Sequence, residues 1–117
     1  MPFKFEQLQV WQLAIELSDR VNGLCKSFPK NERFILTSQM KRAADSVSLN
    51  IAEGSTVQSN EEFNRFLGYA LRSAIEMVSC LHLTKGRKYI SEFEFKEHYD
   101  FIDSLCRRLQ ALRNTLK

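Results

Sequence analysis

The chain has 117 residues, enough for one domain that buries about two-thirds of the surface of the unfolded chain. Lysine and arginine number 17 against 14 aspartates and glutamates, and the net charge of +3 is too small to indicate a nucleic-acid-binding protein by itself. No apolar run is long enough to cross a membrane, and the N-terminus lacks the layout of a signal peptide. Three cysteines without a C-x-x-C spacing fit free thiols in a reducing compartment. We therefore expect one cytoplasmic domain, residues 1–117, without a membrane partner.

Two helical segments are predicted in the first half of the chain. Over about 6–27, apolar residues recur every three or four positions until Phe28-Pro29 interrupts the pattern. The second predicted helix covers about 33–53. Gly54 follows it and predicts a left-handed helix end.

Two further helices are predicted in the second half. The third covers about 60–85 and opens at Ser59 and Asn60, which are both capping residues. The fourth covers about 91–116 and opens at Ser91, with Glu94 at the spacing of a capping box. Four helices of about twenty residues, joined by short loops, predict an all-α, up-down-up-down four-helix bundle.

The second predicted helix carries a polar row beside its apolar stripe. The row recurs with helical spacing and consists of Gln39, Arg42, Ser46, Asn50 and Glu53. It is either a solvated flank of the helix or a polar seam that is buried or lies between subunits. We expect a structural role, in which Asn50 and Glu53 bond to backbone donors or to Arg42 near the loop after Gly54.

The third predicted helix is apolar over about half of its circumference. A bundle helix that faces only its own core needs a narrower stripe. The excess indicates either an oligomer interface or a central, well-covered helix, and we favour the interface. Its candidate residues are Tyr69, Leu71, Ile75 and Val78.

No group of residues indicates an active site. Helical bundles that hold two metals use Glu-x-x-His pairs, and neither His82 nor His98 follows a glutamate at that spacing. The chain has no glycine-rich phosphate loop and no nucleophile with a base beside it in a recognisable pattern. We therefore expect no catalytic, metal-binding or cofactor-binding residues and no enzyme activity. An RNA-processing enzyme is the weakest alternative.

Basic residues gather at both ends of the predicted bundle. One end has Lys26, Lys30, Arg33, Lys85, Arg87 and Lys88, and the other has Lys4, Arg107, Arg108, Arg113 and Lys117. Such cations can simply complement helix dipoles. A ring of subunits, however, would join the last four of these residues into a basic rim that holds nucleic-acid phosphates. No aromatic-basic RNA-recognition motif is present, so binding would depend on the shape or backbone of the nucleic acid more than on its base sequence.

Several motifs span nearly the whole chain: Phe5-x-x-Leu8-x-Val10-Trp11-Gln12-x-Ala14, Phe28-Pro29-x-x-Glu32-Arg33-Phe34-x-Leu36-Thr37-Ser38-Gln39, Arg42-Ala43-Ala44-x-Ser46-Val47, Asn50-Ile51-Ala52-Glu53-Gly54, Phe63-x-x-Phe66-Leu67-x-x-Ala70-x-x-Ser73-x-x-Glu76 and Tyr89-Ile90-Ser91. Together they resemble the 23S rRNA intervening-sequence protein family. The chain departs from the family pattern at Ile35, where glycine is common, and at Ser48, where proline is usual. Because serine restores a backbone donor, a straighter second helix is expected.

The resemblance implies a four-helix bundle from a bacterial, cytoplasmic family that has no established enzyme activity. It also implies a relation to the accessory bundle proteins of retroelements, which work with a reverse transcriptase and nucleic acid, and assembly as a homopentamer. We therefore expect a non-catalytic bundle that associates with itself and binds structured RNA or a nucleic-acid-handling protein. The alternative is a protein-interaction scaffold without a nucleic-acid role.

Overall fold

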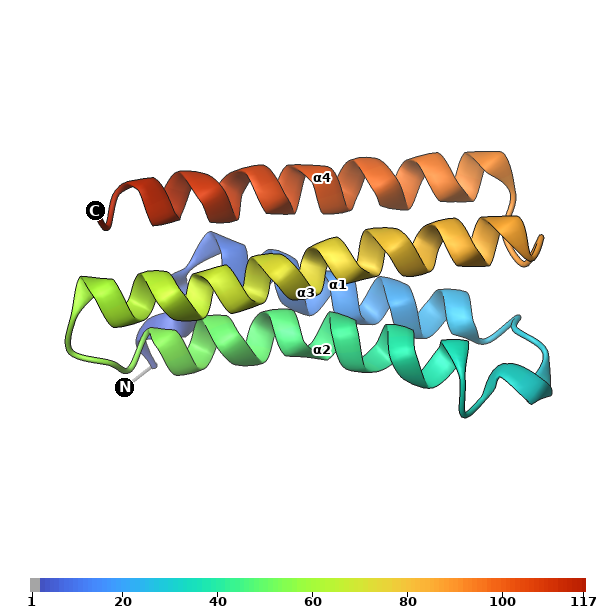
Figure 1. Cartoon of the computed structure of the whole chain (residues 1–117), viewed down its shortest axis with the longest axis horizontal. Helices are drawn as coiled ribbons and strands as arrows, with labels where there is room; N and C mark the ends of the chain where they lie inside the picture. The colour runs from blue at the N-terminus through green and yellow to red at the C-terminus, as the bar shows by residue number, and fades with distance from the viewer. Residues whose placement is uncertain (1–2) are drawn as a thin grey trace.

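The computed structural model of the chain describes residues 3–117 and is a bundle of four α-helices (Figure 1). The helices are α1 (Gln9–Cys25), α2 (Leu36–Gly54), α3 (Asn60–Gly86) and α4 (Glu92–Asn114). Two short 3-10 helices, η1 (Lys4–Gln7) and η2 (Lys30–Glu32), precede α1 and α2. No strand occurs within residues 3–117. The predicted all-α class and the four helices are confirmed.

The helices lie along one long axis (Figure 1). The α1–α2 and α3–α4 connections lie at one end of the molecule, which we call the connection end, and the α2–α3 connection lies at the other (Figure 1). The 27 residues of α3 span about 40 Å at 1.5 Å per residue, close to the 44 Å length of the molecule. Among the helices within residues 3–117, none is both long enough and apolar enough to cross a membrane.

Two helices begin later than their apolar spacing suggested, because 3-10 turns occupy the preceding residues. Leu8 N donates to the Phe5 carbonyl at 3.0 Å, which closes η1, so α1 begins at Gln9. Before α2, Ile35 has φ −120° and ψ −97°, outside the helical region, so this helix begins at Leu36. Apolar residues recur at similar spacing in both kinds of helix, and periodicity alone does not separate them.

The predicted caps of the last two helices are present. Ser59 Oγ accepts from the backbone N–H of Glu62 at 3.1 Å at the start of α3. At the start of α4, Ser91 and Glu94 form a reciprocal capping box with distances of 3.1 and 3.0 Å. Caps of this kind each stabilise a protein by about 0.5–2 kcal/mol.

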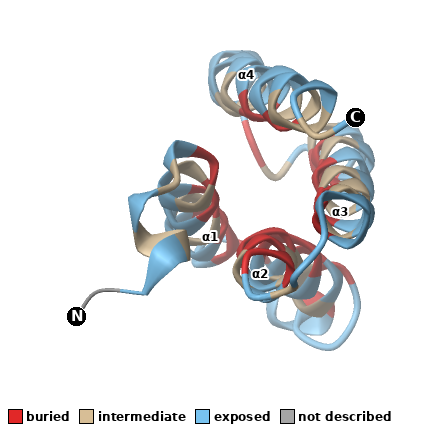
Figure 2. Ribbon diagram, turned by 90° about the vertical axis from the view of Figure 1, so that its left-hand side faces the viewer, coloured by how far each residue is buried: buried red, intermediate tan, exposed pale blue. Residues whose placement is uncertain are grey.

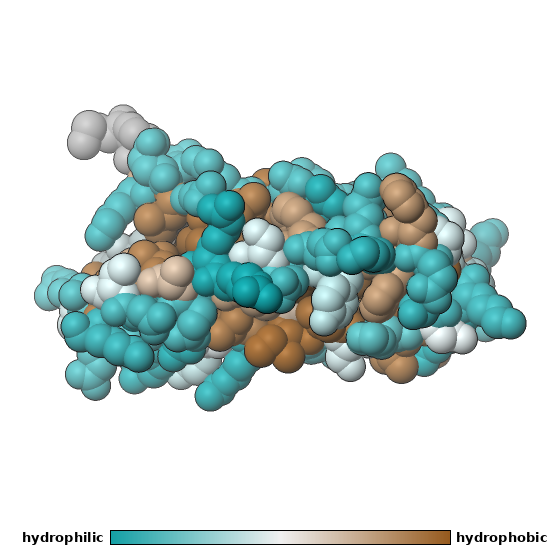
Figure 3. Space-filling view, turned by 90° about the horizontal axis from the view of Figure 1, so that it is seen from above, coloured by the Kyte–Doolittle hydropathy of each residue, from teal (hydrophilic) through white to brown (hydrophobic). Residues whose placement is uncertain are grey.

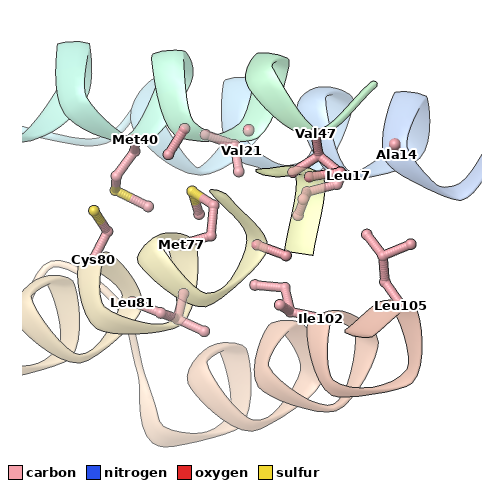
Figure 4. Close-up of a cluster of buried hydrophobic side chains, with 14 of the residues drawn as sticks. Ala14, Leu17, Val21, Met40, Val47, Met77, Cys80, Leu81, Ile102 and Leu105 are labelled. Atoms are coloured by element: carbon pink, nitrogen blue, oxygen red, sulfur yellow. The ribbon is translucent and has the colours of Figure 1, made fainter. Parts of the chain in front are cut away.

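The core lies between the four helices, on the faces that point toward the bundle centre (Figure 2). Each helix contributes the apolar stripe of its sequence, and Figure 4 shows side chains from all four meeting there. The large side chains that are almost completely buried include Leu17, Val21, Met40, Val47, Ile51, Leu67, Met77, Leu81, Ile102, Leu105 and Leu109.

The second helix ends at Gly54 as predicted, but the left-handed conformation predicted there was wrong, because close packing and not positive φ requires this glycine. The residue is the last of α2, and no glycine in the described part of the chain has positive φ. A Cβ added at Gly54 would lie 2.6 Å from Cβ of Phe66 on α3. The absence of a side chain therefore allows α2 to approach α3 at this point.

We expect Gly54→Ala to destabilise the fold by about 1–3 kcal/mol, because the added methyl group overpacks a helix contact. Gly23→Ala is the matched control, since a Cβ at this position on α1 would meet no atom within 4 Å. The control should leave stability unchanged or raise it by up to about 1 kcal/mol. Chemical unfolding of both variants measures the difference, and equal stabilities would show that the close approach at Gly54 is unimportant.

Candidate functional site

The polar row predicted on the second helix lies along the seam between α2 and α3. Ser73 Oγ on α3 donates to Ser46 Oγ at 2.9 Å, and the amide of Gln39 donates to the carboxylate of Glu76. Together with Arg42, these residues line a polar hollow of about 230 Å³. The hydrogen bonds across the seam link residues 27 and 37 positions apart and fix how α2 sits on α3.

Within one chain, the row is neither fully solvated nor fully buried. Ser46 and Asn50 are half-buried, whereas Gln39, Arg42 and Glu53 are exposed. The predicted bonds of Asn50 were wrong: its amide donates to the carbonyl oxygen of Ser46 at 2.8 Å and to Ser46 Oγ at 3.0 Å. The reason is geometric, because a side chain at i+4 lies over the preceding turn.

The expected bonds of Glu53 are also absent. Its side chain is exposed and forms no hydrogen bond or salt bridge with any residue in the described range 3–117. Only its main-chain oxygen is engaged, accepting from Thr56 Oγ1 at 2.7 Å. Glu53 occupies the outward side of the last turn of α2, where neither Arg42 nor a free backbone donor reaches it.

The surface of α3 is divided between the core and solvent. Of the four predicted interface residues, Leu71 and Val78 are half-buried and pack against the core, whereas Tyr69 and Ile75 are exposed. Because α3 packs against both α2 and α4, it uses a wider apolar arc than a helix with one neighbour. Part of the apolar surface that was predicted to form an interface therefore belongs to the chain's own core.

An apolar groove remains between α3 and α4. It has a volume of about 520 Å³ and is lined by Ile75, Val78, Ser79, His82, Tyr99, Asp103 and Cys106. Ile75 is 55% exposed although it lies in the middle of the longest helix. Seen from the α4 side, patches of apolar surface lie between the hydrophilic side chains (Figure 3).

The four residues predicted for a basic rim are largely engaged with neighbours in the chain. Arg107 pairs with Asp103 at 3.0 Å, and Arg108 donates to Gln9 Oε1 at 2.7 Å. Arg113 donates to Asn64 Oδ1 at 2.7 Å, while Lys117 is exposed. The surface hollow around the last two also contains Glu61 and Glu62. These acids reduce the positive potential at this end of a single chain.

A buried carboxylate at the connection end was not singled out by sequence reasoning. Glu32 is 7% exposed and accepts from Tyr89 Oη at 2.7 Å and from a guanidinium nitrogen of Arg87 at 2.9 Å. The hydrogen bond from Tyr89 and the charge of Arg87 hold the pKa of Glu32 below its ordinary value, although desolvation opposes them. The cluster ties η2 to the α3–α4 connection.

The two histidines lie in different surroundings. The ring of His82 packs on Phe95 with centroids 4.9 Å apart, at one end of the α3–α4 groove. His98 Nδ1 lies 3.5 Å from the guanidinium of Arg20, at the contact between α4 and α1. Burial is the main cause that lowers the pKa of His98, and Arg20 lowers it further. Within residues 3–117, no group of three or more His, Cys, Asp and Glu side chains is placed to hold a metal ion.

The three thiols are free, with Cys25 and Cys80 buried and Cys106 half-buried. Burial raises the pKa of each of them, so the unreactive thiol form predominates at neutral pH. Cys25 and Cys80 therefore behave as small apolar groups of the bundle interior, and Cys106 lines the α3–α4 groove.

Comparisons with known proteins agree with this architecture. No curated protein matches the chain. The fold is shared with the crystal structure of a protein with unknown function from the S23 ribosomal protein family of Bacteroides thetaiotaomicron VPI-5482, with a TM-score of 0.82 and 24% identity. The alignment covers 89% of this chain and 97% of that chain. Residues 6–111 match the family model described as 23S rRNA-intervening sequence protein. The chain therefore belongs to the 23S rRNA-intervening sequence protein family.

Proposed function

We propose that the protein is a non-catalytic, up-down-up-down four-helix bundle that associates with itself, as a pentamer, in the bacterial cytoplasm. The observation that supports self-association is the α3–α4 groove, where Ile75 remains exposed beside Val78 and Tyr99. Exposed apolar surface of this kind on a small protein marks a contact with another molecule. Three free thiols fit a reducing compartment.

The proposed absence of catalysis is supported by the interactions that the polar side chains and the thiols already form within the chain. The hydroxyls and amides of the α2–α3 seam bond to one another, and the cysteines are held as thiols by burial. Glu76, the carboxylate of the seam, accepts from Gln39 and has no histidine or lysine beside it in the hollow. This arrangement orders two helices and lacks the paired acid and base of a catalytic site.

Light scattering tests the proposal directly. The assembled protein should have a mass several times that of the 13.7 kDa chain at micromolar concentration. A mass equal to one chain would overturn self-association.

A second proposal concerns structured RNA. Arg107 and Lys117 remain exposed near the end opposite the connection end, and a ring of subunits would repeat them around one rim. Repetition matters because each phosphate contact releases counterions and adds to the affinity. Backbone contacts of this type carry little sequence preference.

The rim is tested by replacing Arg107 and Arg108 together with alanine. We expect weaker binding to structured RNA and duplex DNA alike and a flatter dependence on salt, because fewer phosphates are neutralised. Arg72→Ala, at an exposed position on α3, is the control for loss of one surface charge. If the wild type does not bind at low salt, or the double variant binds equally well, the scaffold without a nucleic-acid role replaces this proposal.

A further inference from the structure

An exposed aromatic ring projects from the segment between η2 and α2. Phe34 is 84% exposed, and the guanidinium carbon of Arg33 lies 5.3 Å from its ring centroid. Lys30, the first residue of η2, is also exposed. We call Lys30, Arg33 and Phe34 the aromatic tip.

The exposure of Phe34 follows from a well-defined turn. On one side, Glu32 is held in the interior by Tyr89 and Arg87, and on the other, Leu36 is buried in the core. The backbone between them is closed by a bond from Ile35 N to the Glu32 carbonyl at 3.0 Å. With both flanking side chains fixed inward, Arg33, Phe34 and Ile35 are displayed outward, so the tip is preorganised.

The charge around the aromatic tip is mainly positive. At the connection end, the exposed cations Lys26, Lys30, Arg33 and Lys88 form no salt bridge within the described residues. The nearby acids are already engaged: Glu32 pairs with Arg87, and Glu92 pairs with Lys85 at 3.1 Å. An approaching anion therefore meets cations that are free to bind it.

We propose that the aromatic tip binds single-stranded nucleic acid, with an unpaired base stacked on Phe34 and neighbouring phosphates held by Lys30 and Arg33. One flat, exposed ring with a guanidinium beside it and a further exposed cation in η2 matches a base and its phosphates. Ile35 beside Phe34 is also 63% exposed, but these two side chains form a small apolar area among free cations, whereas a second protein copy would be matched by a broader apolar area with fewer free charges. The site needs no assembly and lies at the end of the molecule away from Arg107 and Arg108, so it goes beyond the function proposed above.

The tip differs from a recognition motif that is visible in sequence, because it contains a single aromatic residue. Phe34 is one of 9 phenylalanines in the chain, and most phenylalanines in proteins are buried. Its exposure and the guanidinium beside it become visible only when the turn is built.

The test measures binding of a fluorescent oligouridylate, and of a duplex of the same length, by anisotropy at low salt. Phe34→Ala should weaken binding of the single strand by about 5- to 150-fold, the range found for loss of one base–aromatic stack. Phe34→Leu should lose as much affinity for the single strand, because leucine keeps apolar area but has no π face. Phe34→Trp should bind at least as tightly as the wild type.

Phe93→Ala is the matched control. This phenylalanine is 75% exposed at the same end of the molecule, but its chain neighbours are Glu92 and Glu94, and no Lys or Arg of the described residues lies over its ring. Its removal should leave the affinity unchanged. The double replacement of Arg107 and Arg108 should also leave the binding of the single strand intact, which separates this site from the proposed rim.

Several results would overturn the proposal. They are no binding of the single strand by the wild type, equal affinity for the duplex, wild-type affinity in Phe34→Leu, or an equal loss in Phe93→Ala. A change of assembled mass in Phe34→Ala would instead identify the tip as a contact between copies of the chain and would also overturn it. Far-UV circular dichroism establishes that each variant is folded.

Discussion

Ile75→Asp should dissociate the assembled protein or cause it to aggregate. If the α3–α4 groove is covered by another subunit, the variant places an unpaired charge in an apolar contact. Uncompensated buried charges cost about 3–5 kcal/mol, which raises a dissociation constant by roughly two to four orders of magnitude. The measurement is the mass in solution by light scattering, with helix content followed by circular dichroism.

Ile15→Asp provides the matched control, because this isoleucine is exposed on α1 and lies outside the groove. It should keep the wild-type mass. A wild-type mass in Ile75→Asp would show that the groove is not the interface, even if the protein assembles through another face. Dissociation of both variants would indicate a general effect of added charge and would equally contradict the role of the groove.

The helices were predictable because their signals are local. The spacing of apolar residues every three or four positions placed the core face of each helix, and Ser59 and Ser91 marked two starts. The 3-10 turns η1 and η2 were missed because they have similar spacing over only three or four residues. Their hydrogen bonds depend on backbone angles that composition does not determine.

The surface of α3 shows where helical periodicity is not sufficient. Its broad apolar arc was correctly identified. The sequence did not show, however, which of these apolar residues pack in the chain's own core and which are left to contact another molecule. That division depends on how many neighbours the helix has, and α3 contacts both α2 and α4. Leu71 and Val78 therefore pack inward, and Tyr69 and Ile75 remain exposed.

The polar contacts of the candidate sites depend on residues far apart in sequence. Ser46 and Ser73 meet across the α2–α3 seam, and Glu32 meets Tyr89 over a separation of 57 residues. Each of these residues was part of a recognised motif, yet no spacing rule relates one motif to another. Helical spacing thus indicated which face of a helix is polar, but it did not indicate which distant residues those polar side chains contact.

Glu32→Gln should lower the melting temperature at neutral pH, because the variant removes the charge that Arg87 and Tyr89 stabilise. The pKa of Glu32 is lowered in the folded protein, so folding favours the carboxylate form. This contribution is present above the ordinary glutamate pKa of about 4.3 and is lost as the pH falls through that value to the lowered one. The difference in melting temperature between wild type and variant should therefore shrink as the solution is acidified.

The pH dependence separates the charge from a simple loss of packing, since a packing defect persists at every pH. Glu53→Gln is the matched control, because its exposed carboxylate forms no side-chain bond in the described part of the chain, and it should follow the wild type throughout. Tyr89→Phe removes the principal hydrogen bond that lowers the pKa of Glu32, so the folded-state pKa moves closer to the unfolded one. The stability lost on acidification should therefore be smaller than in the wild type and should be complete at a higher pH. Melting curves recorded from neutral pH through the carboxylate range measure all three variants. A difference between wild type and Glu32→Gln that stays constant with pH would show that the buried carboxylate does not stabilise the connection end through its charge.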